Sequence, residues 1–364
     1  MMVVSKQYQI FFDFLRFCIS SESEIPSSLK EADWEELYAI AKKQCLVGVL
    51  FDGIKKLPAE QVGMKMGLLF QWIAKNRMLE KANVRLNDAA IQVSEWFRKK
   101  GFRTCILKGQ GNALMYPNPY SRTPGDIDIW VEGGDKRVIS FVRSISPHEK
   151  ACYHHIEFPS YKGVEVEVHY RPSFLLCFSH NRKLQKFYER MKEEQFSHRV
   201  MLGKQGEIAI PTAEFNLIFQ LTHIYAHLMN EGIGLRQLLD YYYVLISDDL
   251  LLIRDRVQKE LKELGLWKFA GGIMYIMQEV FGMPASRLIV PPNEKYGKFV
   301  LNEVLEAGNF GKHDERNRFG RSQLGHNLQR VYRDIRLVRY FPAEALCEPI
   351  FRTWHFFWRM KNKN

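Results

Sequence analysis

The stretch Ile106–Val131, ILKGQGNALMYPNPYSRTPGDIDIWV, organises the rest of the chain. It begins with an apolar strand and passes through a Lys-Gly turn, a short helix and an arginine before ending in an alternating acidic strand. Because successive side chains of a strand point to opposite faces, Asp126 and Asp128 share one surface while Ile127 and Ile129 are directed into a core. Two carboxylates on one surface repel each other, but Mg²⁺ accepts such oxygen ligands when it also binds phosphate. The stretch is therefore the predicted active site.

A second acidic strand offers a partner for this pair. The sequence VEVEVHY, residues Val164–Tyr170, alternates so strictly that Glu165, Glu167 and His169 share one face and the valines the other. If this strand lies beside the first, one glutamate can complete a cluster of three carboxylates. Glu165 and Glu167 stand about 7 Å apart along the strand, so we do not expect both to reach one ion.

The turn between the two halves of the first stretch suits a phosphate group. Gly109 and Gly111 permit close backbone approach, and a short helix from about residue 112 to 115 would present free N–H groups. Lys108 is predicted to contact phosphate, the alternative being an exposed turn lysine. Arg122, four residues before Asp126, carries the same two interpretations.

These residues carry a resemblance to a known family. The pattern LKG, then an arginine, then DIDIWV, with EVHY some forty residues later, resembles the polymerase-β-like nucleotidyltransferase superfamily. It is most similar to a poorly characterised bacterial branch in which Lys-Gly stands where better-known members have Gly-Ser. The resemblance covers roughly residues 102–171. It implies that Asp126 and Asp128 hold catalytic Mg²⁺ or Mn²⁺, that Glu167 is the third carboxylate, and that Lys108, Gly109 and Arg122 bind the nucleotide.

The function implied is metal-dependent transfer of a nucleoside monophosphate from an NTP to a hydroxyl group of an acceptor. A small molecule, a protein or an RNA would each serve as acceptor. The serine that contacts nucleotide phosphate in familiar members is replaced here, so a catalytically inactive nucleotide- or RNA-binding module with the same fold is the alternative. A purely structural helical scaffold is disfavoured by the Asp-x-Asp pattern.

The flanks of this region are helical. The longest helix is predicted from about Met66 to Lys99, where apolar residues recur at helical spacing, and Gly101 ends it. We expect an α+β protein, with a small mixed β-sheet as nucleotidyltransferase core between helical segments. The predicted domains are an amino-terminal helical domain (1–100), the α/β core (101–210) and a carboxy-terminal helical domain (211–364).

The carboxy-terminal part adds polar residues that face a possible substrate cleft. His223 and His227 lie four apart on one predicted helix, and Arg236 and Asp240 lie on the next. The spacing of the two histidines suits zinc, but no third ligand is fixed by sequence. We therefore favour hydrogen-bonded contacts between helices, or a position in the wall of the substrate cleft, for His223 and His227. His169 is expected to line the same cleft.

Three features near the carboxyl end concern partners. The glycine-rich, charged segment 308–321 is predicted to be a linker or lid. The next helix has an apolar face, with four arginines elsewhere that either form a solvated basic surface or bind nucleic acid or lipid weakly. The final helix, with Trp354, Phe357 and Trp358, is predicted to pack against the bundle rather than to lie on a membrane. The apolar face of the penultimate helix comprises Leu324, Leu328, Val331, Ile335 and Val338, and its arginines are Arg330, Arg333, Arg336 and Arg339.

The composition limits the remaining possibilities. The chain of 364 residues has 52 Lys and Arg against 41 Asp and Glu, a formal charge of +11 that favours polyanionic partners such as nucleotides. Its six cysteines show no metal-ligand spacing and are predicted to be reduced. Neither a signal sequence nor a run of eighteen apolar residues is present, which predicts a cytoplasmic protein without a membrane span.

Overall fold

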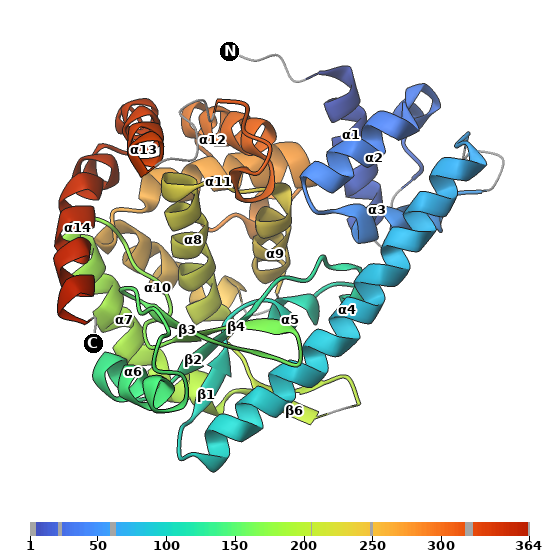
Figure 1. Ribbon diagram of the computed structural model, residues 1–364. Coiled ribbons are helices and arrows are strands. Elements are labelled where there is room, and N and C mark those ends of the chain that lie inside the picture. The colour runs from blue at the N-terminus through green and yellow to red at the C-terminus, as the bar shows by residue number, and fades with distance from the viewer. Residues whose placement is uncertain are drawn as a thin grey trace.

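The computed structural model describes residues 5–20, 24–58, 63–204, 206–247, 250–316 and 323–362. A small four-stranded sheet lies between a long helix on one side and a cluster of helices on the other (Figure 1). This confirms the predicted α+β class. The predicted division into three domains stays a prediction. The buried apolar residues form two clusters, and the larger cluster joins amino-terminal to carboxy-terminal helices.

The sheet brings the two acidic strands together. Its order is β1 (Thr104–Ile106), β2 (Ile127–Val131), β4 (Val164–His169) and β3 (His155–Tyr161). Strands β1 and β2 are antiparallel, β2 and β4 are parallel, and β3 and β4 form an antiparallel hairpin. Asp128 lies directly opposite Glu167 in the β2–β4 register. The condition for a three-carboxylate cluster is thereby met.

The alternation of the strands assigns one face of the sheet to each layer of helices. Ile127, Ile129 and the valines of β4 belong to the smaller core, with residues of the long helix α4 (Met66–Lys99) and of α6 (Gly134–Ile145). Trp130, on the opposite face with Asp128, packs against Phe196 and Phe215. These two aromatic residues belong to α7 (Phe178–Ser197) and α8 (Ala213–Asn230). The acidic side chains therefore face the carboxy-terminal helices.

The amino-terminal helices support the start of α4. The bounds of α4 agree with the prediction, and Gly101 follows its end with a φ of 80°. Before α4 come α1 (Lys6–Ile19), α2 (Trp34–Lys43) and α3 (Val47–Ile54), at the upper end of α4 in Figure 1. The short helix α5 (Gln110–Ala113) begins two residues earlier than predicted. A separate antiparallel hairpin is formed by β5 (Arg199–Leu202) and β6 (Gly206–Ala209).

The remaining helices wrap the second face of the sheet. They are α9 (Leu235–Leu245), α10 (Leu250–Glu263), α11 (Trp267–Phe281), α12 (Glu294–Ala307), α13 (Gln323–Val338) and α14 (Pro342–Lys361). In the segment predicted as a linker or lid, residues 308–316 include a short 3₁₀ turn (Asn309–Gly311), and 317–322 fall outside the described residues. Among the described residues, no helix has the length and apolarity needed to span a membrane.

The prediction that the arginines of α13 face solvent is wrong, whereas the prediction that α14 packs against the protein holds for part of that helix, including Phe351 and Trp354. On α13, Arg333 and Arg336 point inward, with an ion pair between Arg336 and Glu303, while Leu328 and Ile335 are 45% and 66% exposed. On α14, Trp358 packs against the smaller core, but Phe357 is 61% exposed. Buried carboxylate and carbonyl partners attract the arginines, so the polar side of α13 faces the protein. The expected arginine surface is thus reduced to Arg330 and Arg339.

Candidate active site

The three predicted carboxylates meet at the edge of β2 and β4. One oxygen of each of Asp126, Asp128 and Glu167 lies within 4.8 Å of the other two, a distance that one cation can bridge. Asp128 is buried, whereas Asp126 and Glu167 are half-buried. The charge of Asp128, together with burial, raises the pKa of Asp126. The cluster therefore carries unrelieved repulsion, and oxygen-only ligands of this kind suit Mg²⁺ or Mn²⁺.

Two cationic side chains hold Asp128 in its ionised form. Lys108 Nζ lies 3.0 Å from Asp128 Oδ2, and His169 Nε2 lies 3.0 Å from Asp128 Oδ1 and 3.4 Å from Glu167. Burial opposes the charge on Asp128, but these two partners outweigh it and hold its pKa below the ordinary value. Burial likewise opposes the charge on His169, yet both carboxylates raise its pKa to about 9. Asp128 is thus neutralised, whereas Asp126 is not.

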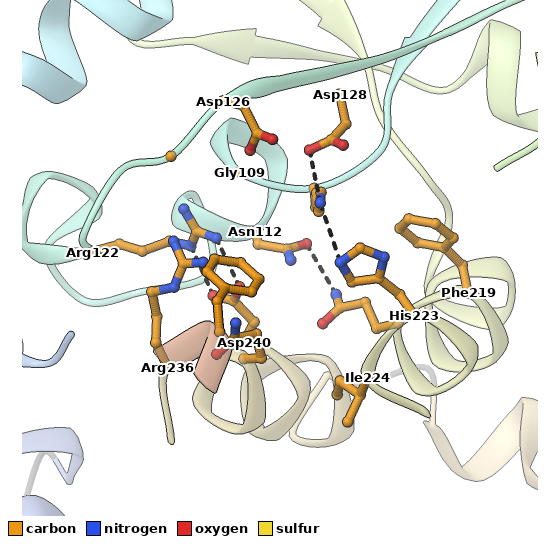
Figure 2. Close-up of a pocket in the computed structure, with 15 residues that line it drawn as sticks. Gly109, Asn112, Arg122, Asp126, Asp128, Phe219, His223, Ile224, Arg236 and Asp240 are labelled. Carbon is orange, nitrogen blue, oxygen red and sulfur yellow. Dashed lines mark hydrogen bonds and ion pairs between the residues drawn. The ribbon is translucent and has the colours of Figure 1, made fainter. Parts of the chain in front are cut away.

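Lys108 also begins a line of polar contacts on the helical side. Its Nζ lies 3.1 Å from His223 Nε2, and His223 Nε2 lies 2.9 Å from His227 Nε2. His227 then contacts Glu231 at 2.5 Å. Burial and the charge of Lys108 lower the pKa of His223, so His223 is neutral and accepts a hydrogen bond from Lys108. Figure 2 shows the contacts from Asp128 to His223.

The turn at Gly109 is fixed by backbone conformation and by α8. Gly109 has a φ of 64°, which a residue with a side chain rarely adopts. Asn112 accepts hydrogen bonds from Gln220 at 3.0 Å and from Asn216 at 3.3 Å, so α5 is tied to α8. This arrangement directs Lys108 towards the carboxylates. Lys108 is therefore not the exposed turn lysine of the alternative interpretation.

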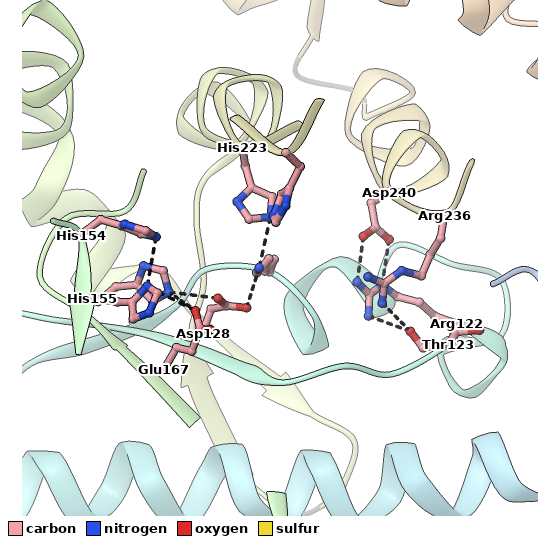
Figure 3. A network of polar contacts seen from close by, with 12 residues as sticks. Arg122, Thr123, Asp128, His154, His155, Glu167, His223, Arg236 and Asp240 are labelled. Atoms are coloured by element: carbon pink, nitrogen blue, oxygen red, sulfur yellow. Dashed lines mark hydrogen bonds and ion pairs between the residues drawn. The ribbon is translucent and has the colours of Figure 1, made fainter. Parts of the chain in front are cut away.

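A second set of possible metal ligands adjoins the carboxylates. His155 Nδ1 lies 3.5 Å from Glu167 and 3.0 Å from His154 Nε2 (Figure 3). Burial and neighbouring His169 lower the pKa of His155 to about 4, so it is neutral near pH 7. His155, Glu167 and His169 have ligand atoms within 4.8 Å of one another, as do Cys152, His154 and His155. Hydrogen bonding within this group accounts for the same distances.

Arg122 and Arg236 stand side by side but differ in their partners. Arg122 makes two hydrogen bonds of 2.8 Å to Asp240, which also accepts one of 2.7 Å from Tyr116. Arg236, only 7% exposed, donates to the carbonyl of Thr123 and leaves its Nε without a partner. Burial and the charge of Arg122 lower the pKa of Arg236. No ion pair joins Arg236 to a carboxylate among the described residues, so its buried charge is left to attract an anion from the pocket that it lines (Figures 2 and 3).

Two adjoining pockets open on either side of this site. Both are lined by Lys108, Asp126, Asp128, His223 and Phe310. The first continues past Gly109 and Gly125 to Arg122, Arg236 and Asp240. The second continues past Glu167 and His169 to His154, His155 and His227. The carboxylates thus separate an arginine-lined pocket from a histidine-lined one.

The structure brings the predicted residues together around these pockets. Lys108 and Gly109 lie beside the three carboxylates of Asp126, Asp128 and Glu167. His169, His223 and His227 line the second pocket, and Arg122, Arg236 and Asp240 line the first. Their catalytic and binding roles stay predictions.

Sequence reasoning missed Phe310, Glu231 and Tyr116. Phe310 lies 5.0 Å from the ring of His227 and 5.6 Å from the guanidinium of Arg236, and has a φ of 55°. Its only sequence signal is a position between Gly308 and Gly311. Both glycines have positive φ, which marks a tight turn.

Comparison with known proteins assigns the class. Residues 30–282, well over half of the chain, match the sequence model of a family described as uncharacterised nucleotidyltransferase, and the chain belongs to this family. Phe310, α13 and α14 lie outside the matched range. No match was found among curated proteins. The crystal structure of an antigenic nucleotidyltransferase-like protein from Paracoccidioides brasiliensis is similar at 15% identity and a TM-score of 0.28, covering 50% of this chain and 92% of that one. A likeness this low carries no argument, so the assignment rests on the family match.

Proposed function

We propose that the protein transfers a nucleoside monophosphate from an NTP to a hydroxyl group of an acceptor, with Mg²⁺ or Mn²⁺. The observation that carries this proposal is the meeting of Asp126, Asp128 and Glu167 within 4.8 Å beside a buried arginine without a carboxylate partner. Phosphoryl transfer depends mainly on positioning and on neutralising charge. The site supplies groups for both.

The three carboxylates would hold the divalent ion. When bound, such an ion neutralises phosphate charge and acidifies a hydroxyl group. Asp128 stays ionised through Lys108 and His169, so it is available as a ligand throughout the neutral pH range. Asp126 lines both pockets and, together with Glu167, would complete the set of oxygen ligands.

The arginine-lined pocket would take the triphosphate. Arg236 would donate to an incoming phosphate, and Lys108, which lines the same pocket, would add a second positive charge. Arg122 lines the same pocket but is paired with Asp240. The nucleotide-binding role that we propose for Arg122 is therefore to hold the pocket wall in place and to add to the positive potential in the pocket.

The histidine-lined pocket would take the acceptor. Neutral His155 offers a ring nitrogen for hydrogen bonding to a hydroxyl group, and Phe310 offers an apolar surface. A small molecule or a protein side chain enters such a recess directly, whereas an RNA would present one terminal hydroxyl.

Labelled nucleotides test the reaction. The protein is incubated with each α-labelled NTP, Mg²⁺ and a cell extract, and we expect one labelled product that Asp128→Ala abolishes. Glu165→Gln and Glu167→Gln form a matched pair on β4. Glu165 is exposed and lines neither pocket, so only Glu167→Gln should lose activity. Loss in Glu165→Gln with normal activity in Glu167→Gln would reverse the assignment of the third carboxylate.

The alternative is a catalytically inactive module that binds a nucleotide or an RNA end. The specific observation that favours it is Gly109 in the place of the phosphate-binding serine of the resembled superfamily. Saturable NTP binding that depends on Arg236, without any labelled product, would support this alternative over transfer.

A further inference from the structure

Helix α13 exposes an apolar stripe to solvent. Leu328, Val331, Tyr332 and Ile335 follow the spacing i, i+3, i+4 and i+7, which places them on one side of the helix. They are between 41% and 66% exposed. A surface helix of a globular protein ordinarily buries such a stripe.

The inward side of α13 explains this orientation. Arg333 donates to the carbonyl of Glu231 at 3.3 Å, and Arg336 lies 3.4 Å from the carboxylate of Glu303. Leu337 is fully buried on the same inward side. The helix is thus held by polar contacts on one side, and these contacts fix the outward direction of the apolar stripe.

Helix α14 continues the apolar surface. Leu346, Ile350 and Phe357 follow the spacing i, i+4 and i+11, and all are more than 60% exposed. Trp354, Phe356 and Met360 are exposed beside them. Nearly half of the exposed large apolar side chains in the described part of the chain lie on α13 and α14, which pack together along one edge of the molecule (Figure 1).

Basic and acidic side chains differ in exposure on α13, on α14 and in the turn between them. Four basic residues of this segment are exposed, namely Arg330 on α13, Arg339 in the turn, and Arg359 and Lys361 on α14. All three acidic residues of α13 and α14 are turned inward and have hydrogen-bond or ion-pair partners. Glu344 accepts hydrogen bonds from the backbone of Leu176 and Cys177, while Glu348 and Asp334 face Arg352. Among the described side chains of these helices, the charged groups that are exposed are therefore cationic, and they accompany the apolar ones.

We propose that α13 and α14 form an interfacial hairpin that rests on an anionic lipid surface. Aromatic and aliphatic side chains enter the boundary between headgroups and acyl chains, and arginine and lysine contact the lipid phosphates. A second copy of the chain fits less well, because a symmetric contact places the same cations near one another without acidic partners. This inference does not depend on the proposed reaction.

Flotation of the full chain with lipid vesicles tests the proposal. We expect binding to phosphatidylcholine vesicles that contain phosphatidylglycerol, little binding to pure phosphatidylcholine, and release at high salt, because screening shortens the reach of charge to about 3 Å at 1 M. Replacing Arg330 or Arg339 with Gln should weaken vesicle binding about fivefold in each case. One Lys or Arg near an anionic surface contributes a binding free energy that corresponds to about this factor. Arg77→Gln, exposed on α4, is the matched control.

A second matched pair tests the apolar stripe. Phe357 and Phe70 are 61% and 60% exposed, so Phe357→Ser should lose vesicle binding while Phe70→Ser keeps it, and neither should change the melting temperature. The proposal is overturned if the wild type does not bind anionic vesicles, or if both Phe variants bind equally. It is also overturned if light scattering shows a dimer that Phe357→Ser dissociates, because the stripe is then a contact between copies.

Discussion

Arg122 and Asp240 meet in two parallel hydrogen bonds of 2.8 Å although 118 residues separate them. Both side chains are buried, and Tyr116 completes the coordination of the carboxylate. The pair joins the segment before β2 to α9. Because Asp240 is occupied by Arg122, the neighbouring Arg236 keeps an uncompensated charge that faces the first pocket. A difference in role between the two arginines follows from this pairing.

Removing Arg122 should damage the fold. Arg122→Ala leaves the buried carboxylate of Asp240 without its cation, and breaking a buried pair in this way costs about 3–5 kcal/mol. Urea denaturation measures the loss. The double variant Arg122→Met with Asp240→Leu removes both charges and should recover most of the stability. An unfolding free energy within about 1 kcal/mol of wild type for Arg122→Ala would contradict the structural role.

Removing Arg236 should affect ligand binding and leave stability intact. Arg236→Met keeps the apolar contact of the side chain and deletes a cation whose burial is only partly compensated, so the free energy of unfolding should stay equal or rise. A ligand that binds only the native state raises the melting temperature according to its concentration over Kd. We expect the shift produced by Mg²⁺ and NTP to disappear in Arg236→Met. A full shift in this variant would show that the triphosphate binds elsewhere.

The two aspartates should respond in opposite ways to loss of charge. Asp126→Asn relieves repulsion from Asp128, so it should leave the metal-free protein equally or more stable. Asp128→Asn leaves Lys108 and His169 without their buried anion and should destabilise it by about 3 kcal/mol or more. The sequence pattern, with two carboxylates on one strand face, predicts the same effect for both. Thermal melting in the presence of a chelator distinguishes the two, and equal changes would contradict the structure.

His169 should make stability depend on pH above neutrality. Its pKa is raised from 6.5 to about 9 in the folded protein, so its contribution is complete below pH 6.5 and is lost as pH rises through 9. The loss corresponds to about 3 kcal/mol, at 1.36 kcal/mol for each unit of pKa. His169→Gln is neutral at every pH and should lack this component. The difference in unfolding free energy between the two proteins, measured from pH 6 to 10, should shrink across that window. A constant difference would show that His169 is not the titrating group.

Gly48 should couple the amino-terminal helices to the site. A Cβ atom at Gly48 on α3 would lie 2.2 Å from the carbonyl oxygen of Ser121, the residue before Arg122. Backbone cannot move aside as a flexible side chain does, so Gly48→Ala should destabilise the protein by about 1–3 kcal/mol and weaken NTP binding. Gly67→Ala on α4 is the control, because its Cβ meets nothing within 4 Å, and it should stabilise by about 0.5–1 kcal/mol. Similar effects of the two changes would exclude the coupling.

Local sequence patterns were enough to predict the strands, the long helix and the acidic side chains that share a face of each strand. Strict alternation assigns Asp126 and Asp128 to one face of the first strand and Glu167 to one face of the second, because a strand offers only two faces and valine and isoleucine occupy the other. Helical periodicity likewise gave α4 its bounds. These are short-range properties, which neighbouring residues carry in their order. That the two strands lie side by side was a condition that the tertiary structure met.

Only the tertiary structure decided how the charged side chains are paired and which side of α13 faces inward. Lys108 with Asp128, Arg122 with Asp240 and Lys108 with His223 depend on where distant segments pack. Amphipathic spacing shows that a helix has two unlike sides, but buried carboxylate and carbonyl partners turned the arginine side of α13 inward. The energy of a buried charge depends on its partner, and a partner more than a hundred residues away leaves no local pattern in the sequence.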